Sequence, residues 1–277
     1  MTPQTLHLSD PARRAIDADA DRPVRVHVWR ADREDAPLLV LSHGTGGAAE
    51  GLAWWADGLR AAGFDVAAID HHGNNYLDGY LAEGFTWWWE RPLDVSFVLD
   101  HVDARGPVGA CGFSIGGYTA AAVCGARVSA NAYAALMTGQ IESPPTPEYP
   151  GIADELAARY DESDARAWVE LAAADYRDTR VRAGFLLCPA VGPLITSESL
   201  AAVDVPVGVR WAAADDITPP AGNGMRYADL IPGADGGTVG APTAGHYGFV
   251  LPEQDDPHAK ADVVAASTSF FAGALHG

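Results

Sequence analysis

Residues 106–123 read GPVGACGFSIGGYTAAAV, a small apolar run, a G-x-S-x-G element and an Ala-rich segment in succession. The apolar run suits a central parallel strand, and the Ala-rich segment from Tyr118 to Val123 favours a helix. The pattern therefore predicts that Ser114 lies on a sharp strand-to-helix turn, the context in which G-x-S-x-G forms a nucleophile elbow. A side chain at position 112 or 116 of such a turn would collide with the neighbouring strand or helix, which explains Gly112 and Gly116.

Other short apolar runs are separated by helix-length segments. Val24–Arg30 alternates apolar and polar residues like a half-buried edge strand, and we expect it to be the first strand. Further strands are predicted at 37–41, 64–69, 106–111, 183–188 and 207–211. This spacing predicts an α/β fold with a mostly parallel central sheet and helices on both faces.

One connection is too long for an ordinary loop between a strand and a helix. It holds a Pro-rich stretch at 143–150 and a helical pattern from Ile152 to about Tyr176. We expect a small cap or lid at about 130–180, inserted into a single domain that covers residues 1–277.

Composition excludes several classes of partner. Eighteen basic and 37 acidic residues give a net charge of −19 at pH 7, which disfavours nucleic acids and anionic lipid surfaces. No apolar run is long enough to span a membrane, and residues 1–21 lack the apolar core of a signal peptide, so we expect a cytoplasmic protein. Cys111, Cys124 and Cys188 lie in apolar segments without C-x-x-C spacing and are expected to be buried thiols. The sequence does not indicate an oligomeric state.

A catalytic serine needs a histidine and a carboxylate, and the chain offers both after Ser114. Asp215 follows the strand that ends at Trp211, and His246 lies in a Gly-flanked loop. The order Ser114, Asp215, His246 is that of α/β-hydrolases. Asp216 is adjacent, and the choice of acid stays open; we favour Asp215 because it is the first acid of its D-x-I-x-P loop.

The loop Ser42–Gly47 reads SHGTGG and follows another predicted strand. It lacks the G-K-[ST] of a P-loop and the spacing of G-x-G-x-x-G, so a nucleotide site is not indicated. In an α/β-hydrolase this loop and the residue after the nucleophile supply the N–H groups of the oxyanion hole, here Thr45 and Ile115. We expect His43 to be an anchor of this loop at the pocket wall rather than a second base.

Side chains near the same sheet edge are candidates for the substrate pocket. The segment Asp70–Asn74 contains adjacent histidines without the spaced carboxylates or cysteines of a metal site, so no metal is predicted. Arg91 and Asp94 lie three apart on a predicted helical segment and are expected to form an ion pair. The residues proposed for the pocket are His43, His71, Trp87, Trp88 and Tyr247.

Five motifs together resemble one family. They are Leu41–Gly47, Asp70–Asn74, Arg91–Asp94, Gly112–Gly117 and Gly245–Tyr247. The combination, spread over residues 37 to 253, resembles the bacterial predicted dienelactone hydrolases, a group similar to platelet-activating-factor acetylhydrolases. Authentic dienelactone hydrolases carry a cysteine at the elbow, so the resemblance implies a serine carboxylic-ester hydrolase rather than lactone hydrolysis.

The sequence thus predicts hydrolysis of a small-molecule ester through an acyl-enzyme on Ser114, with no metal or organic cofactor. Two alternatives stay open. The same triad would serve a thioesterase, an amidase or an acyltransferase of a biosynthetic pathway, and the same fold would serve a catalytically silent binding protein.

Overall fold

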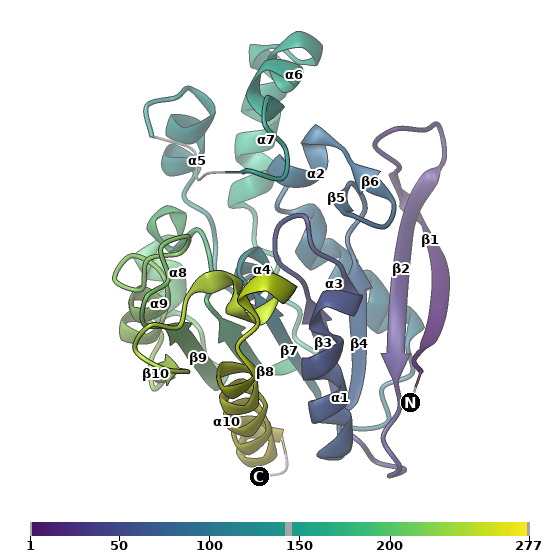
Figure 1. Cartoon of the computed structure of the whole chain (residues 1–277). Helices are drawn as coiled ribbons and strands as arrows, with labels where there is room; N and C mark the ends of the chain where they lie inside the picture. Colours follow the sequence, from purple (N-terminus) through teal and green to yellow (C-terminus); the bar gives the residue numbers. More distant parts are fainter. Residues whose placement is uncertain (1, 142–145, 276–277) are drawn as a thin grey trace.

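A computed structural model describes residues 2–141 and 146–275; residues 142–145, which include the first part of the Pro-rich stretch at 143–150, lie outside the described residues. Eight strands form one sheet in the order β1-β2-β4-β3-β7-β8-β9-β10 (Figure 1). Strand β2 is antiparallel to β1 and to β4, and every other neighbouring pair is parallel. The strands are β1 (Gln4–Arg14), β2 (Asp21–Trp29), β3 (Leu38–Ser42), β4 (Asp65–Asp70), β7 (Val108–Phe113), β8 (Val181–Leu187), β9 (Val207–Ala212) and β10 (Asp235–Val239), and a small hairpin pairs β5 (Asn74–Asn75) with β6 (Gly79–Tyr80).

The prediction of a mostly parallel sheet is confirmed. Every residue of β3, β4 and β7 is buried, because helices cover both faces of these central strands. The prediction that residues 24–30 form the first strand is wrong, since β1 precedes β2 in the chain and lies outside it at the edge of the sheet.

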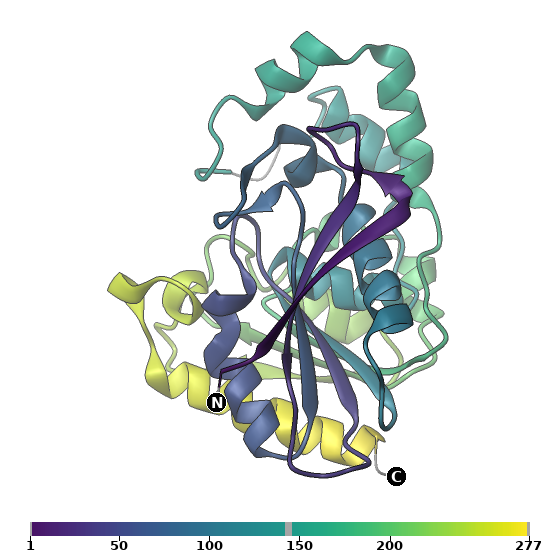
Figure 2. The same ribbon diagram turned by 90° about the vertical axis from the view of Figure 1, so that its right-hand side faces the viewer.

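Two hydrophobic cores lie on the two faces of the sheet. Figure 2 views the sheet from its β1 edge, with α1 and α10 on one side and α3 on the other. The helices around the sheet are α1 (Ala53–Ala61), α2 (Ala82–Thr86), α3 (Glu90–His101), α4 (Ile115–Val123), α8 (Ser197–Ala201), α9 (Gly224–Leu230) and α10 (Pro257–Leu275). Short 3-10 turns occur at η1 (Ala49–Leu52), η2 (Gly192–Leu194), η3 (His246–Phe249) and η4 (Pro252–Gln254).

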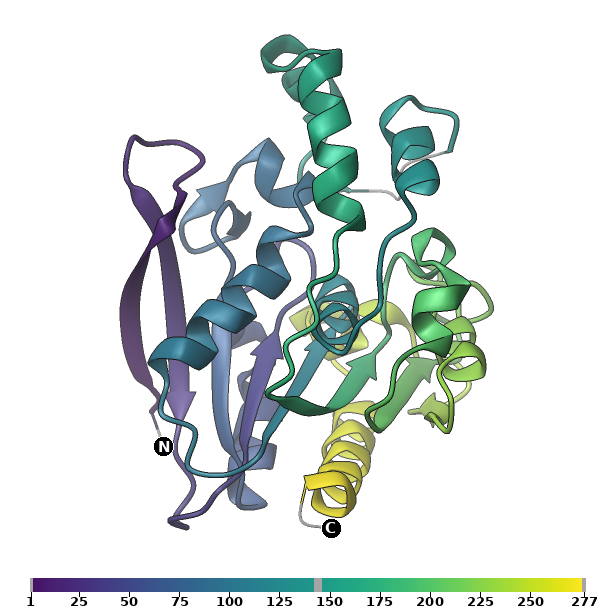
Figure 3. The ribbon, with the colours of Figure 1, turned by 180° about the vertical axis from the view of Figure 1, so that it is seen from behind.

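Between α4 and β8, the part of the chain that the structure describes holds three helices: α5 (Ala130–Met137), α6 (Ile152–Arg159) and α7 (Glu162–Ala173). Figure 3 shows α6 and α7 beyond the carboxyl ends of the parallel strands. The helical pattern expected from residue 152 to about 176 corresponds to two helices, α6 and α7. Asp161 starts the second one, because its carboxylate accepts from the backbone N–H groups of Ser163 and Asp164, and Asp164 returns a bond to the N–H of Asp161.

Candidate active site

Ser114 occupies the turn between β7 and α4. Its φ of 57° and ψ of −121° are strained values for a residue with a side chain. The neighbouring strand β8 and its following loop hold this geometry: the Ser114 N–H donates to Leu187 O at 2.9 Å, and its carbonyl accepts from Ala190 N at 3.0 Å. The predicted strand-to-helix turn is therefore present.

The glycines on either side of Ser114 have no room for a side chain. A Cβ atom on Gly112 would lie 2.2 Å from the carbonyl oxygen of Gly116, and one on Gly116 would lie 2.0 Å from that of Ser42. Both contacts are to backbone atoms, which could be displaced only at a large cost in free energy. The turn can close only with glycine at both positions.

A carboxylate holds one nitrogen of His246. Asp215 Oδ2 lies 2.7 Å from His246 Nδ1, and both side chains are buried, whereas Asp216 is exposed. Asp215 also accepts from the backbone N–H groups of Ile217 and Thr218 and from the Thr218 hydroxyl. Burial raises the pKa of Asp215, but the bonds from His246 and Thr218 outweigh it and bring the pKa below its ordinary value. The carboxylate is thus ionised at neutral pH, and Nδ1 of His246 is the donor to it, which leaves Nε2 as a base.

His246 lies next to the elbow. The ring of Phe113, the residue before Ser114, packs against the His246 imidazole with 4.6 Å between ring centroids. Ser114 and His246 both line one cavity of about 780 Å³, a volume within the usual range for small-molecule sites. Three elements separated in sequence therefore bring a serine, a histidine and an aspartate to the same place.

The loop after β3 forms the adjoining wall. A Cβ atom on Gly44 would lie 3.3 Å from Ser114 Cβ, so the loop backbone runs directly beside the serine. Thr45 and Ile115 both line the cavity. Ile115 is the first residue of α4, so its N–H has no acceptor within the helix and carries the positive end of the helix dipole.

The predicted pocket residues divide into two groups. His43, Trp88 and Tyr247 line the cavity, whereas His71 and Trp87 are not among its described lining residues. His71 is buried between Ser42 and Asp94, with its Nε2 2.8 Å from Ser42 Oγ and its Nδ1 2.9 Å from Asp94 Oδ2.

Trp87 packs against residues that line the cavity but does not itself line it. Its ring stacks on Trp89 and meets the rings of Tyr160 and Trp168 edge-on. It thereby links the start of α3 to α7, which is a packing role. The placement of His71 and Trp87 in the pocket wall is therefore corrected.

His43 is held at both ring nitrogens. Nδ1 donates to Gly44 O at 2.6 Å, and Nε2 accepts from the backbone N–H of His71 at 3.2 Å. Burial, Arg91 and His71 bring the pKa of His43 well below its ordinary value, so the ring is neutral at pH 7. With both nitrogens occupied by backbone groups, the ring has the geometry of an anchor rather than of a base.

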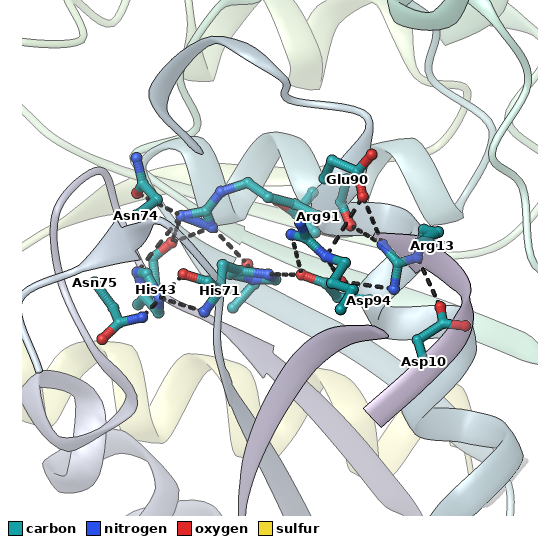
Figure 4. Close-up of polar contacts among 12 residues, drawn as sticks. Asp10, Arg13, His43, His71, Asn74, Asn75, Glu90, Arg91 and Asp94 are labelled. Atoms are coloured by element: carbon teal, nitrogen blue, oxygen red, sulfur yellow. Dashed lines mark hydrogen bonds and ion pairs between the residues drawn. The ribbon is translucent and has the colours of Figure 1, made fainter. Parts of the chain in front are cut away.

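The expected ion pair between Arg91 and Asp94 is not formed. Asp94 instead bonds to Arg13, Arg22 and His71, and the Arg91 guanidinium points to the loop after β3 (Figure 4). Arg13 and Arg22 come from β1 and β2, which spacing along the helix cannot reveal.

One group of described residues has metal-ligating atoms close together, namely Cys188, Asp215 and His246, all buried. Asp215 and His246 are already bonded to each other there. Cys111, Cys124 and Cys188 are buried free thiols, as predicted.

Sequence reasoning missed Thr218 and most of the cavity wall. Thr218 bonds to Asp215 through an Asx-type turn, for which the Asp-x-x-Thr spacing is a weak signal. The wall also includes side chains from the three inserted helices, among them Tyr133, Leu136, Ile152, Leu156 and Trp168. No local pattern could have assigned these to the cavity, because they reach it only through tertiary packing.

No known protein family and no curated protein sequence matches the chain. Solved structures do match. Est1E from Butyrivibrio proteoclasticus is 12% identical with a TM-score of 0.57, and the match covers 99% of each chain. A dienelactone hydrolase from Anabaena variabilis is 15% identical with a TM-score of 0.57, covering 99% of this chain and 100% of that one.

Thermogutta terrifontis esterase 2, solved after phosphorylation by paraoxon, is 15% identical with a TM-score of 0.59 and covers 100% of this chain and 97% of its own. At these identities the likeness establishes the fold: the chain has the α/β-hydrolase fold, as predicted. Within the described residues, no helix has the length and apolar character needed to cross a membrane.

Proposed function

We propose that this chain is a serine-dependent carboxylic-ester hydrolase with Ser114, His246 and Asp215 as its catalytic triad. The observation that carries the proposal is the meeting of Ser114 and His246 on the wall of one cavity, with Asp215 bonded to the far nitrogen of His246. A serine hydroxyl becomes nucleophilic when a neighbouring base can take its proton, and the carboxylate fixes the tautomer of that base.

In the proposed reaction, Ser114 Oγ attacks the ester carbonyl while His246 Nε2 takes the hydroxyl proton. The backbone N–H groups of Thr45 and Ile115 stabilise the negative oxygen of the tetrahedral intermediate. Collapse breaks the bond to the alcohol, which leaves with the proton from His246. A water molecule then attacks the acyl-enzyme with His246 again as base, and the acid is released as Ser114 regains its proton.

The comparisons support this proposal. Two proteins of similar fold are named esterases, and one of them is phosphorylated by paraoxon. One structure of Est1E contains ferulic acid. These are properties of those proteins, and they raise the expectation that the same fold here carries out acyl transfer.

The cavity wall favours an apolar, uncharged ester. Aromatic and aliphatic side chains make up most of it, and its described lining residues include no lysine or arginine. Glu148, Asp161 and Glu162 lie on it. An anionic substrate would therefore lose hydration without gaining a cationic partner, whereas a neutral apolar acyl or alcohol group would gain from burial.

The first test is labelling by a fluorophosphonate together with hydrolysis of p-nitrophenyl esters. Wild type should label and turn over, and Ser114→Ala should lose the label and about 10⁶-fold in kcat. A wild type that neither labels nor hydrolyses would instead favour a silent binding protein. Residual turnover near the wild-type rate in Ser114→Ala would refute the assignment of the nucleophile.

The second test separates ester hydrolysis from its closest rivals. Ester, thioester and amide substrates with the same acyl group are compared, with and without an added alcohol acceptor. The proposal expects the highest kcat/KM for the ester with free acid as product. A preference for the thioester or amide, or an acylated alcohol as the main product, would assign the chain to a thioesterase, an amidase or an acyltransferase.

A further inference from the structure

The Arg91 guanidinium is directed at backbone carbonyls of the loop after β3. Arg91 is the second residue of α3 and only 2% exposed. Its Nη1 and Nη2 donate to His43 O at 3.1 and 3.0 Å, and Nη2 also reaches Gly44 O at 3.4 Å. One planar group therefore holds two consecutive peptide units (Figure 4).

These two peptide units lie immediately before Thr45. The carbonyl of Gly44 and the N–H of Thr45 belong to the same planar trans peptide, so they point in opposite directions. Gly44 O accepts from Arg91, from His43 Nδ1 and from the N–H of Gly47. Because these donors fix the direction of the carbonyl, they also fix the direction of the Thr45 N–H, and Thr45 lines the cavity.

Asn74 adds further hydrogen bonds to the same loop. Its Oδ1 accepts from Arg91 Nη2 at 3.3 Å and from the N–H of Gly46 at 2.9 Å, and the Tyr80 hydroxyl donates to Gly46 O. The segment from His43 to Gly46 is thus held on both sides of Thr45. A hydrogen-bond donor that is fixed before the reaction stabilises a developing oxyanion without a reorganisation cost.

The guanidinium of Arg91 forms no direct ion pair with a carboxylate among residues 2–141 and 146–275, although the charge of Asp94 attracts it at longer range. The nearest candidate, Asp94, is occupied by Arg13, Arg22 and His71. Burial brings the pKa of Arg91 down to about 9, and the side chain is still cationic at neutral pH. A buried cation with only neutral acceptors is costly for stability, and an apolar side chain would avoid that cost.

We infer that Arg91 is a positioning residue for the proposed hydrolysis, holding the His43–Gly44 backbone so that the Thr45 N–H faces the oxyanion. The inference rests on the proposed function and concerns a residue outside the triad and outside the cavity wall. His71 supports the arrangement, because it joins Asp94 to Ser42 Oγ, which itself accepts from Arg91 Nη1.

The test compares Arg91→Met and Arg91→Lys with wild type. Loss of an oxyanion-hole donor costs about 10²- to 10³-fold in kcat, so a donor that is only misdirected should cost about 10- to 100-fold. KM should stay unchanged, because the carbonyl of the bound ester carries no full negative charge and its hydrogen bonds to the oxyanion hole are weak. Lysine keeps the charge but cannot bond to two carbonyls with one rigid group, so Arg91→Lys should recover only part of the activity.

Inhibitor binding gives a readout that loss of stability would not produce. An octyl trifluoromethyl ketone adds to the catalytic serine and places an oxyanion in the hole, whereas octyl methyl ketone remains a neutral carbonyl. Arg91→Met should bind the first about 10- to 100-fold more weakly and the second equally well. Arg105→Met is the control: Arg105 bonds to Asp65 and Ala31 far from the cavity, and its loss should change neither kcat nor ketone preference.

The outcomes separate the two proposals. An inactive, unlabelled wild type refutes the proposed function and the inference with it. An active wild type overturns the inference alone if Arg91→Met keeps the wild-type kcat or weakens both ketones equally. If Arg91→Met does not fold, the ketone comparison on Arg91→Lys decides, and failure of both variants to fold would assign Arg91 a structural role and overturn the inference.

Discussion

At the scale of single residues, two adjacent acids provide a matched pair. Asp215 bonds to His246 and is buried, while Asp216 is exposed. Asp215→Asn should lower kcat by about 10⁴-fold, because an amide favours the wrong histidine tautomer. Asp216→Asn should leave kcat unchanged. The measurement is p-nitrophenyl ester turnover, with thermal unfolding to show that both variants fold; the reverse order of effects would move the triad acid to Asp216.

The elbow glycines make a second prediction, this time about stability. Gly116→Ala would place a Cβ atom 2.0 Å from Ser42 O and should lower the free energy of unfolding by about 3 kcal/mol or prevent folding. Gly273→Ala is the control, since Gly273 lies in α10 with nothing within 4 Å of its added Cβ. There alanine should raise stability by up to about 0.5 kcal/mol. Urea denaturation measures both, and equal effects would contradict the steric account.

Residue types and spacing predicted the elbow and the chain position of Asp215, because each follows a recognisable strand, and that of His246, because it lies in a Gly-flanked loop. They could not predict what Arg91 touches. Its partners are backbone carbonyls about 50 residues earlier in the chain, and Asp94 is bound by arginines from the first two strands. Both contacts join residues that are far apart in the sequence, so spacing along the chain could not predict them.

At the scale of elements, the sequence predicted the buried central strands and missed both edges of the sheet. Strand β1 contains Pro11 and is largely exposed, and β10 has two glycines among its five residues. Edge strands need only one paired side and one covered face, so their sequences carry little of the apolar signal that marks central strands.

We expect the inserted helices to determine which acyl lengths the cavity accepts. Leu156 on α6 lines the cavity, so Leu156→Trp should partly fill it. We expect kcat/KM for long-chain p-nitrophenyl esters to fall at least about tenfold, while the acetate ester is little affected, because only the longer group needs the lost volume.

The matched control is Leu171→Trp on α7. Leu171 is 44% exposed and does not line the cavity, so the same substitution there should not change the preference for acyl length. An equal loss of acetate and long-chain turnover in Leu156→Trp would show that α6 does not form part of the acyl site.

At the scale of the whole molecule, a polar network joins elements that one of the two hydrophobic cores also connects. Asp94 on α3 connects Arg13 and Arg22 from β1 and β2 to His71 after β4, and His71 connects to Ser42 at the end of β3. The loop beside Ser114 is thereby linked to the antiparallel edge of the sheet, so protonation within the network should affect folding as a whole.

The network predicts a pH dependence of stability. Burial and Arg91 lower the pKa of His71 to about 4 against the opposing effect of Asp94, and burial, Arg91 and His71 bring that of His43 well below 6.5. Between pH 6.5 and about 4 the unfolded chain therefore binds protons that the folded protein does not. The free energy of unfolding should fall as the pH falls through this window, by about 1.4 kcal/mol per pH unit for each proton.

The stability should be fully present above pH 6.5, where the histidines are neutral in both states. Burial is the main cause of the loss, and a proton on His43 Nε2 would in addition replace the acceptor of the His71 N–H by a second donor. Urea denaturation at pH 7.5, 6.0 and 5.0 measures how the free energy of unfolding changes with pH. His71→Asn should reduce this change by the contribution of one proton, about 1.4 kcal/mol per pH unit, whereas Ser114→Ala should leave it unchanged. A free energy of unfolding that is flat between pH 6.5 and 5 would mean that these rings are charged in the folded protein, contrary to their burial beside Arg91.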